Sequence, residues 1–372
     1  MRFETLAVRS GGEPDAPSGA LAPPIHLSTT FEHPPDSGEI QGYLYQRYAS
    51  PTQDRLEQAL AALDQGAAAL VFASGMAAGS SLMQNLPAGS HVLMADDCYF
   101  AFRALAAERF ARWQLSFDVV DMSDPQAVRA ALRPNTRCLW LETPSNPRIK
   151  LSPIAELSAL ARAHGALTVV DATFATPALL NPLTLGADVV LHSTTKYLGG
   201  HSDVMGGALI FAQRDALHDA VWTTRKLQGA IASPFASWMI LRGLRTLACR
   251  IDWHCRHAGA LAAHLACHPA IERVHYPGLS THPQHAIAQR EMRGYGGMLS
   301  VEVRGGRAAA LRVASRLRLF TNATSLGGYE SLVEHRQSVE GPDSPTPANL
   351  LRLSVGLEAA EDLIDDFDQA LA

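Results

Sequence analysis

The sequence has few charged residues, few cysteines and lysines, and no long apolar run, and each of these shortages excludes a class of protein or site. Charged residues make up 18% of the 372 residues and the formal net charge is −5, so no basic surplus points to nucleic acid or an anionic membrane surface. No apolar run approaches the ~18 residues that a membrane-spanning helix requires. The first residues lack the apolar core of a signal peptide, and we expect a cytoplasmic protein.

Cysteine and lysine are both scarce. The five cysteines are odd in number and scattered, which is not the pattern of a disulfide framework. His264 and His268 lie one helical turn apart, as a pair of metal ligands can, but the stretch from Cys249 to His268 has no CxxC and no Glu after the first His, so no metal site is predicted. Of the 31 lysine and arginine residues, only three are lysines: Lys150, Lys196 and Lys226. A side-chain amine nucleophile therefore has three candidates.

The middle of the chain alternates short apolar runs with helical stretches. The runs are 69–72, 91–94, 119–120, 138–141, 167–170, 188–191 and 208–211, and the helical stretches between them include 100–112, 125–132 and 153–164. This alternation predicts an α/β domain with a mostly parallel sheet that is buried on both faces.

The end of the chain predicts a second, smaller α+β domain. A long helical stretch runs from Ser233-Pro234 toward Pro269, followed by strands at 298–303 and 350–355 and helices near 307–317 and 359–371. Residues 1–45 are rich in Gly and Pro and read as an extended arm. We therefore expect an arm over 1–45, a large domain over 46–232 and a small domain over 233–372.

Polar segments follow four of the apolar runs. They are Ser74-Gly75-Met76, the stretch from Glu142 to Pro147, Asp171-Ala172-Thr173, and the stretch from His192 to Lys196. Ligands of open α/β sheets bind outside the carboxyl ends of the strands, so these segments predict one shared site.

The residue types in these segments suit one cofactor. Ser74-Gly75-Met76 offers backbone N–H groups and a helix dipole to an anion, the hydroxyls of Ser193 and Thr195 add to that cradle, and Arg47 is a candidate extra charge. Neither a P-loop nor a GxGxxG fingerprint is present, so the anion is not a nucleotide phosphate held in those ways. Asp171 can face a protonated ring nitrogen, and Lys196 can form a Schiff base. A phosphate cradle, a pyridinium partner and such a lysine are what pyridoxal 5′-phosphate (PLP) requires.

A set of longer segments, in a fixed order, carries a family resemblance. The segments are 23–31, 45–47, 51–52, 74–78, 142–147, 171–177, 192–203, 325–332 and 351–358. On these residues the sequence resembles the cysteine/methionine-metabolism family of PLP enzymes, which includes cystathionine γ-synthase, cystathionine γ- and β-lyases, methionine γ-lyase and the homoserine sulfhydrylases. The resemblance covers nearly the whole chain and implies the aspartate-aminotransferase-like fold, fold type I.

The resemblance also implies a role for each matching residue. Lys196 is implied as the cofactor-bound lysine and proton shuttle, Asp171 as the partner of the ring nitrogen, and Tyr99 as the tyrosine that stacks on the ring. Further cofactor-binding positions implied are Gly75, Met76, Asn146, Thr173, Ser193, Thr195 and, from a neighbouring subunit, Tyr45 and Arg47. Substrate-binding positions implied are Arg352, as the clamp for the α-carboxylate, with Ser325 and Asn146 beside it. The family is usually a homotetramer, a dimer of dimers with shared sites.

The predicted function is that of a PLP-dependent trans-sulfuration enzyme acting on sulfur amino acids. The favoured reaction is γ-replacement on an activated homoserine with cysteine, or γ-elimination of cystathionine. A cystathionine β-lyase or methionine γ-lyase reaction is the alternative, and a catalytically silent PLP-fold scaffold is a remote one. The sequence context of Lys196 disfavours an aminotransferase or a decarboxylase.

Four departures from the family pattern leave the substrate open. Phe100-Ala101-Phe102 follows the tyrosine, Thr324 stands where many members have Glu, Arg336 stands in place of a proline, and Ser50 in place of an asparagine. None of these positions belongs to the cofactor set.

Overall fold

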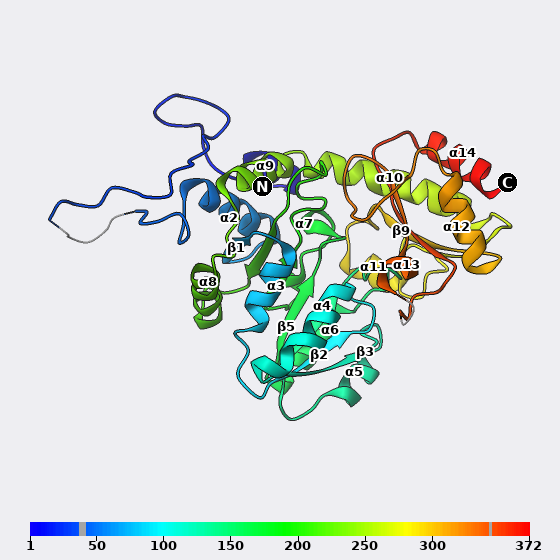
Figure 1. Cartoon of the computed structure of the whole chain (residues 1–372), viewed down its shortest axis with the longest axis horizontal. Helices are drawn as coiled ribbons and strands as arrows, with labels where there is room; N and C mark the ends of the chain where they lie inside the picture. The colour runs from blue at the N-terminus through cyan, green and yellow to red at the C-terminus, as the bar shows by residue number, and fades with distance from the viewer. Residues whose placement is uncertain (37–41, 342–343) are drawn as a thin grey trace.

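The computed structural model of this chain describes residues 1–36, 42–341 and 344–372, so residues 37–41 of the expected arm lie outside it (Figure 1). One sheet has seven strands, in the spatial order β1 (Ala68–Phe72), β7 (Gly207–Phe211), β6 (Val189–His192), β5 (Leu167–Asp171), β4 (Thr136–Glu142), β2 (His91–Ala95) and β3 (Ser116–Val120). Strand β7 runs antiparallel to both of its neighbours, and the other described strands of this sheet share one direction. The mostly parallel sheet is therefore confirmed.

Helices connect or flank the strands of the large sheet along the chain. They are α2 (Pro51–Asp64), α3 (Gly75–Met83), α4 (Phe100–Arg109), α5 (Pro125–Ala131), α6 (Ile154–His164), α7 (Thr176–Leu179) and α8 (Ala216–Gln228), with short 3₁₀ turns η1 (Phe110–Trp113) and η2 (Pro182–Leu185). Every residue of β2 and β7 is buried, which explains why these strands read as unbroken apolar runs.

The second sheet has five strands and lies beside the first. Its order is β10 (Thr321–Asn322), β11 (Leu332–His335), β12 (Leu350–Ser354), β9 (Met298–Val303) and β8 (Ile271–His275). The helices of this part are α10 (Leu247–Ala266), α11 (His285–Glu291), α12 (Gly306–Arg316), α13 (Arg336–Glu340) and α14 (Ala360–Leu371). The smaller α+β unit expected from the sequence is present.

The two hydrophobic cores meet along α10. Leu247 and Ile251, near its start, belong to the core of the large sheet. Leu261 and Leu265, near its end, belong to the core of the small sheet. The domain boundaries at 45/46 and 232/233 stay predictions, since one helix serves both cores.

The N-terminal part of the chain contains one helix, α1 (Phe3–Arg9), followed by a segment that extends away from the sheets (Figure 1). Helix α2 begins where the chain returns to the body. Ser50 accepts a hydrogen bond from the backbone N–H of Gln53, and Pro51 occupies the first turn, where its missing N–H costs nothing. In the described part of the chain no helix combines the length and apolar character needed to cross a membrane.

The helical stretch expected from Ser233 to Pro269 is interrupted. Helix α9 (Pro234–Leu244) ends, and α10 begins after two intervening residues. The carbonyl of Gly243 lies at this break, where it accepts hydrogen bonds from the Thr246 hydroxyl at 3.2 Å and from Nη2 of Arg250 at 2.7 Å. Arg250 is buried, and its Nη1 donates to the Tyr197 carbonyl at 2.7 Å. One guanidinium thus ties the helix break to the segment that follows β6.

We predict that Arg250→Met lowers the free energy of unfolding by about 3 kcal/mol, because the buried Tyr197 carbonyl loses its charged donor. The matched control is Arg256→Met on the same helix. The Arg256 guanidinium pairs with the exposed Asp252, and we expect loss of this ion pair to lower the free energy of unfolding by less than about 0.5 kcal/mol. Urea denaturation of both variants checks the expectation. Equal stability of the two would show that Arg250 does not hold the break together.

Candidate active site

A cavity of about 290 Å³ lies at the carboxyl-end edge of the large sheet and is closed by residues of the small sheet. It gathers every predicted site residue except Tyr45 and Arg47. These residues are Gly75, Met76, Tyr99, Asn146, Asp171, Thr173, Ser193, Thr195, Lys196, Ser325 and Arg352. Ser74 and Glu142 also line it. The polar segments that follow β1, β4, β5 and β6 therefore do converge, as the parallel sheet requires.

One end of the cavity is suited to a phosphate. Ser74 caps α3 by accepting from the N–H of Ala77 at 3.1 Å, which leaves the helix start at Gly75 facing the cavity. A Cβ on Gly75 would lie 3.1 Å from Cβ and 3.3 Å from Oγ of Ser193, so a larger residue at this position would be tightly packed against Ser193. The combination of a helix N-terminus with the nearby hydroxyls of Ser193 and Thr195 fits a phosphate monoester.

Lys196 lies at the centre of the cavity. Its Nζ donates a hydrogen bond to Oγ of Ser325 at 2.7 Å. Burial, with the nearby positive charge of Arg352, lowers the pKa of this amine to about 8. The lysine is therefore much easier to deprotonate near neutral pH than an exposed lysine, as an amine that bonds to a cofactor aldehyde must be.

Asp171 ends β5 and is buried in the cavity wall. Its Oδ1 accepts from the backbone N–H of Thr173 at 3.0 Å. The Thr173 hydroxyl accepts from the N–H of Ser193 at 2.8 Å, which fixes the ends of β5 and β6 relative to each other. Burial raises the pKa of Asp171, so a cationic ring nitrogen beside it would restore the charged form by pairing with it.

Glu142 holds the backbone of Tyr99 at the cavity wall. Its Oε2 accepts the backbone N–H of Tyr99 at 2.6 Å, and this carboxyl group is buried. Burial, followed by the charge of Asp171, raises the pKa of Glu142 well above its usual value. Tyr99 in turn packs edge-on against Phe100 and Phe102, so its ring has a defined place in the cavity wall.

Arg352 lies in β12 (Leu350–Ser354) and lines the cavity from the small sheet. Its Nη1 donates to Oδ1 of Asn146 at 3.1 Å, and its Nη2 donates to the carbonyl of Ser325 at 3.0 Å and to Oε2 of Glu334 at 2.7 Å. Glu334 lies directly opposite Arg352 in the β11–β12 register. Ser325 has a φ of +90°, a left-handed backbone that non-glycine residues rarely adopt and that is frequent at functional sites.

The sequence-based prediction of the site missed Glu334. This carboxylate is the ion partner of Arg352, yet Leu332-Val333-Glu334-His335 was not among the polar segments that indicated the site. A single acidic residue inside a short buried strand was the available signal, since a buried carboxylate needs a counter-charge. Arg336, Phe100 and Thr324, noted only as departures from a pattern, also line the cavity.

Tyr45 and Arg47 do not line this cavity. They lie near the base of the arm, beside a separate surface hollow with Thr30, Phe31 and Tyr48. Nη1 of Arg47 donates to the carbonyl of Lys226 at 2.9 Å, and Tyr45 is exposed. Tyr45 and Arg47 therefore do not reach the cavity of their own chain. That they bind the cofactor in a neighbouring subunit stays a prediction.

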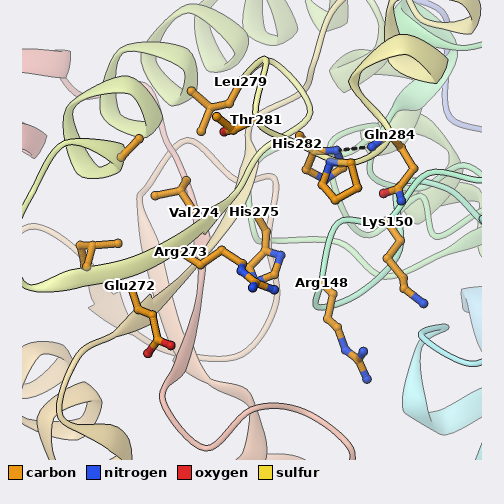
Figure 2. Close-up of a pocket in the computed structure, with 13 residues that line it drawn as sticks. Arg148, Lys150, Glu272, Arg273, Val274, His275, Leu279, Thr281, His282 and Gln284 are labelled. Carbon is orange, nitrogen blue, oxygen red and sulfur yellow. Dashed lines mark hydrogen bonds between the residues drawn. The ribbon is translucent and has the colours of Figure 1, made fainter.

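A larger cavity of about 520 Å³ lies between the loop that follows β4 and strand β8 (Figure 2). Its wall includes Arg148, Lys150, Arg273 and His275, and no predicted site residue. Nζ of Lys150 already pairs with Asp96 at 3.0 Å and Asp121 at 2.8 Å, and His275 pairs with Glu302 at 2.7 Å. We therefore take the smaller cavity, which contains Lys196, as the active site. No cluster of metal-ligating side chains is found among residues 1–36, 42–341 and 344–372.

The fold and cavity define a PLP-dependent α/β enzyme with a lysine at the centre of its site. Comparison with known proteins gives the family: residues 4–372 match the family described as Cys/Met metabolism PLP-dependent enzyme, and the chain belongs to it. The family cofactor is PLP, and the residues described above fit its phosphate, ring and aldehyde ends.

Relatives cover the chain from end to end. The cystathionine gamma-synthase of Mycobacterium tuberculosis is 44% identical over 99% of this chain and 96% of its own length. The cystathionine beta-lyase of Coxiella burnetii is 41% identical over 99% of this chain and 97% of its own. The crystal structure of metB from Corynebacterium glutamicum superposes with a TM-score of 0.97 at 40% identity, covering 100% of this chain and 98% of that one. The chain is therefore a trans-sulfuration enzyme in fold and family.

We predict that Asp171→Asn lowers turnover by about 100-fold or more while the protein stays folded, because an amide cannot stabilise positive charge on the ring nitrogen. The matched control is Asp188→Asn, just before β6 at the opposite edge of the same sheet, where the carboxylate accepts the N–H of Thr168 at 2.7 Å. Steady-state kinetics, with cofactor content measured by absorbance, checks both variants. Near-native turnover in Asp171→Asn would assign this carboxylate another role.

Proposed function

We propose that this chain catalyses γ-replacement on an activated homoserine with cysteine as the incoming thiol. In this reaction the carbon–oxygen bond at Cγ breaks and the acyl group leaves as a carboxylate. The cysteine thiol gives up its proton, and its sulfur bonds to Cγ. The observation that carries the proposal is the closeness of Lys196, Ser325 and Arg352, because it puts a mobile base beside a clamp for an α-amino acid.

The roles of the side chains follow from their geometry. The positively charged guanidinium of Arg352, held in place by Asn146 and the Ser325 carbonyl, is suited to bind an α-carboxylate by charge-assisted hydrogen bonds. Binding there directs the substrate Cα toward Nζ of Lys196. The Ser325 hydroxyl, which accepts from that amine at 2.7 Å, holds Nζ in place between proton transfers.

PLP, when bound, supplies the electron sink that makes the Cα proton of an amino acid removable. The residues that would hold it are Gly75, Ser193 and Thr195 at the phosphate, Asp171 at the ring nitrogen and Lys196 at the aldehyde. The pKa of about 8 at Lys196 lets one amine both accept and return a proton near neutral pH. Removal of a proton first from Cα and then from Cβ is what chemistry at Cγ needs, and one mobile base serves both.

Substrate assays test the proposal directly. We expect the purified holoenzyme to form cystathionine from cysteine and either O-succinylhomoserine or O-acetylhomoserine. Separate incubations with cystathionine and with methionine, analysed for α-ketobutyrate and for pyruvate, cover the alternative reactions. Pyruvate from cystathionine without any γ-replacement would make the chain a β-lyase and overturn the proposal. α-Ketobutyrate from methionine alone would make it a methionine γ-lyase.

We propose further that the active unit is a homotetramer, a dimer of dimers, in which Tyr45 and Arg47 of one chain reach the phosphate in another. What supports this is their location outside the cavity, on an arm that has little core of its own. An exposed tyrosine next to an arginine presents both an apolar ring and a charge to a docking neighbour.

Subunit mixing tests the shared site. Arg47→Ala and Lys196→Ala are each inactive alone, but an equal mixture of refolded or exchanged subunits should recover about a quarter of the native sites, because each hybrid dimer contains one intact site. The matched control mixes Lys196→Ala with Asp171→Asn. Each of these changes damages the cavity of the chain that carries it, so a hybrid dimer has no intact site. If the Arg47→Ala and Lys196→Ala mixture regains no more activity than the control mixture, although hybrid oligomers are verified, Arg47 serves its own chain.

A further inference from the structure

One carboxylate oxygen joins two buried arginines in the wall of the active-site cavity. Oε2 of Glu334 accepts from Nη2 of Arg352 at 2.7 Å and from Nη1 of Arg336 at 2.6 Å. Glu334 and Arg352 are each 4% exposed and Arg336 is 1% exposed, so all three charges are removed from water. Coulomb interactions between them are therefore stronger than those of surface ion pairs.

Arg336 also forms hydrogen bonds with a second carboxylate, that of Glu340. Nε and Nη2 of Arg336 donate to Oε1 of Glu340 at 3.2 and 2.8 Å. Oε2 of Glu340 then accepts from the hydroxyl of Thr346 at 2.8 Å. The guanidinium carbon of Arg336 lies 5.7 Å from the ring centre of Phe100, another cavity residue. Arg336 therefore connects α13 and the wall of the cavity to the ion partner of Arg352.

Because Arg336 and Arg352 share one oxygen of Glu334, less of the Arg352 charge is neutralised, and more of it remains for a ligand. If Glu334 faced Arg352 alone, the pair would be closely neutralised, and a substrate carboxylate would compete with Glu334 for the guanidinium. A second guanidinium on the same oxygen draws part of that negative charge away from Arg352. It also anchors the carboxylate from the far side, so Glu334 cannot follow Arg352 into the cavity.

We propose that Arg336, acting through Glu334, is a positioning residue that fixes the guanidinium of Arg352 for the substrate α-carboxylate and preserves its positive charge for that ligand. This inference rests on the proposed role of Arg352. It gives a function to a residue that the sequence marks only as a departure from the family pattern.

The three charges also act on Lys196, and they act with opposite signs. Arg352 and Arg336 lower the pKa of the Lys196 amine, and Glu334 raises it. The other ionisable groups that line the cavity are Asp171, Glu142 and Tyr99, and the variants below leave them unchanged. Removal of Arg336 should therefore make Lys196 harder to deprotonate, and removal of the Glu334 charge should make it easier.

Kinetics of four variants tests the positioning role. Arg336→Met should raise KM for the amino-acid substrate about tenfold or more, with a smaller change in kcat, because Glu334 is then left to neutralise Arg352 and to compete with the substrate carboxylate. Glu334→Gln removes an anchor of Arg352 but also that competing charge, so its KM should rise less. The double variant should have the KM of Glu334→Gln alone, since Arg336 acts on Arg352 only through the Glu334 carboxylate. Arg336→Lys, which keeps the charge but not the fork, should lie between Arg336→Met and the native enzyme.

Arg307→Met is the matched control. Arg307 ties the same helix, α13, through Gln337 and Ser338, each at 3.0 Å, but it is exposed and outside the cavity. If Arg336 only stabilised α13, Arg307→Met would raise KM as well. We expect it to leave KM at the native value. A native KM in Arg336→Met would overturn the proposal.

Arg352→Lys separates this inference from the function on which it rests. A strong rise in KM for Arg352→Lys with none for Arg336→Met removes only the positioning role. An unchanged KM for Arg352→Lys removes the carboxylate clamp itself, and the positioning role with it.

A second measurement needs no activity. In the cofactor-free protein, competitive labelling of amines with acetic anhydride, followed by peptide mass spectrometry, gives the pH at which Lys196 is half reactive. Lys150 and Lys226, the only other lysines, serve as internal references. That pH should rise in Arg336→Met, fall in Glu334→Gln and stay at the native value in Arg307→Met. No shift, or shifts of the same sign in the first two variants, would contradict the network.

Discussion

The hydrogen bond between Arg352 and Asn146 is the contact on which the geometry of the active site depends. Arg352 belongs to the small sheet, while Asn146 lies in the loop that follows β4 of the large sheet, and the two atoms are 3.1 Å apart. A second contact, from Lys196 to Ser325, crosses between the same two parts of the chain. Together with helix α10, which packs in both cores, these contacts hold the small sheet over the carboxyl ends of the large one.

The chemistry of the site depends on how burial is distributed among its charges. Asp171 and Glu142 are buried carboxyl groups with raised pKa values, and Lys196 is a buried amine with a lowered one. Each is displaced toward its neutral form, which is the expected result of desolvation. A cofactor that brings a ring cation and a phosphate dianion into this space alters that balance, and its binding and the charge state of the site are therefore linked.

Sequence reasoning located the cofactor residues well because each follows a strand of a parallel sheet. Strand ends in such a sheet lie at one edge whatever the strand order, so Gly75, Asp171 and Lys196 could be brought together without knowing the topology. The substrate side was harder to predict. Glu334 and Arg352 are 18 residues apart and meet only through the antiparallel register of β11 and β12, and local periodicity does not encode a register between strands.

By itself the sequence determined the α/β alternation, the buried character of the strands and the identity of the groups that suit PLP, because these follow from local periodicity and residue chemistry. It also showed that only three lysines could serve as the amine. The tertiary structure alone decided that Arg336 lies against Glu334, that α9 and α10 are two helices, and that Tyr45 and Arg47 lie away from the cavity of their own chain. Those features depend on contacts between distant segments, whose free energy is set by packing in three dimensions rather than by neighbouring residues.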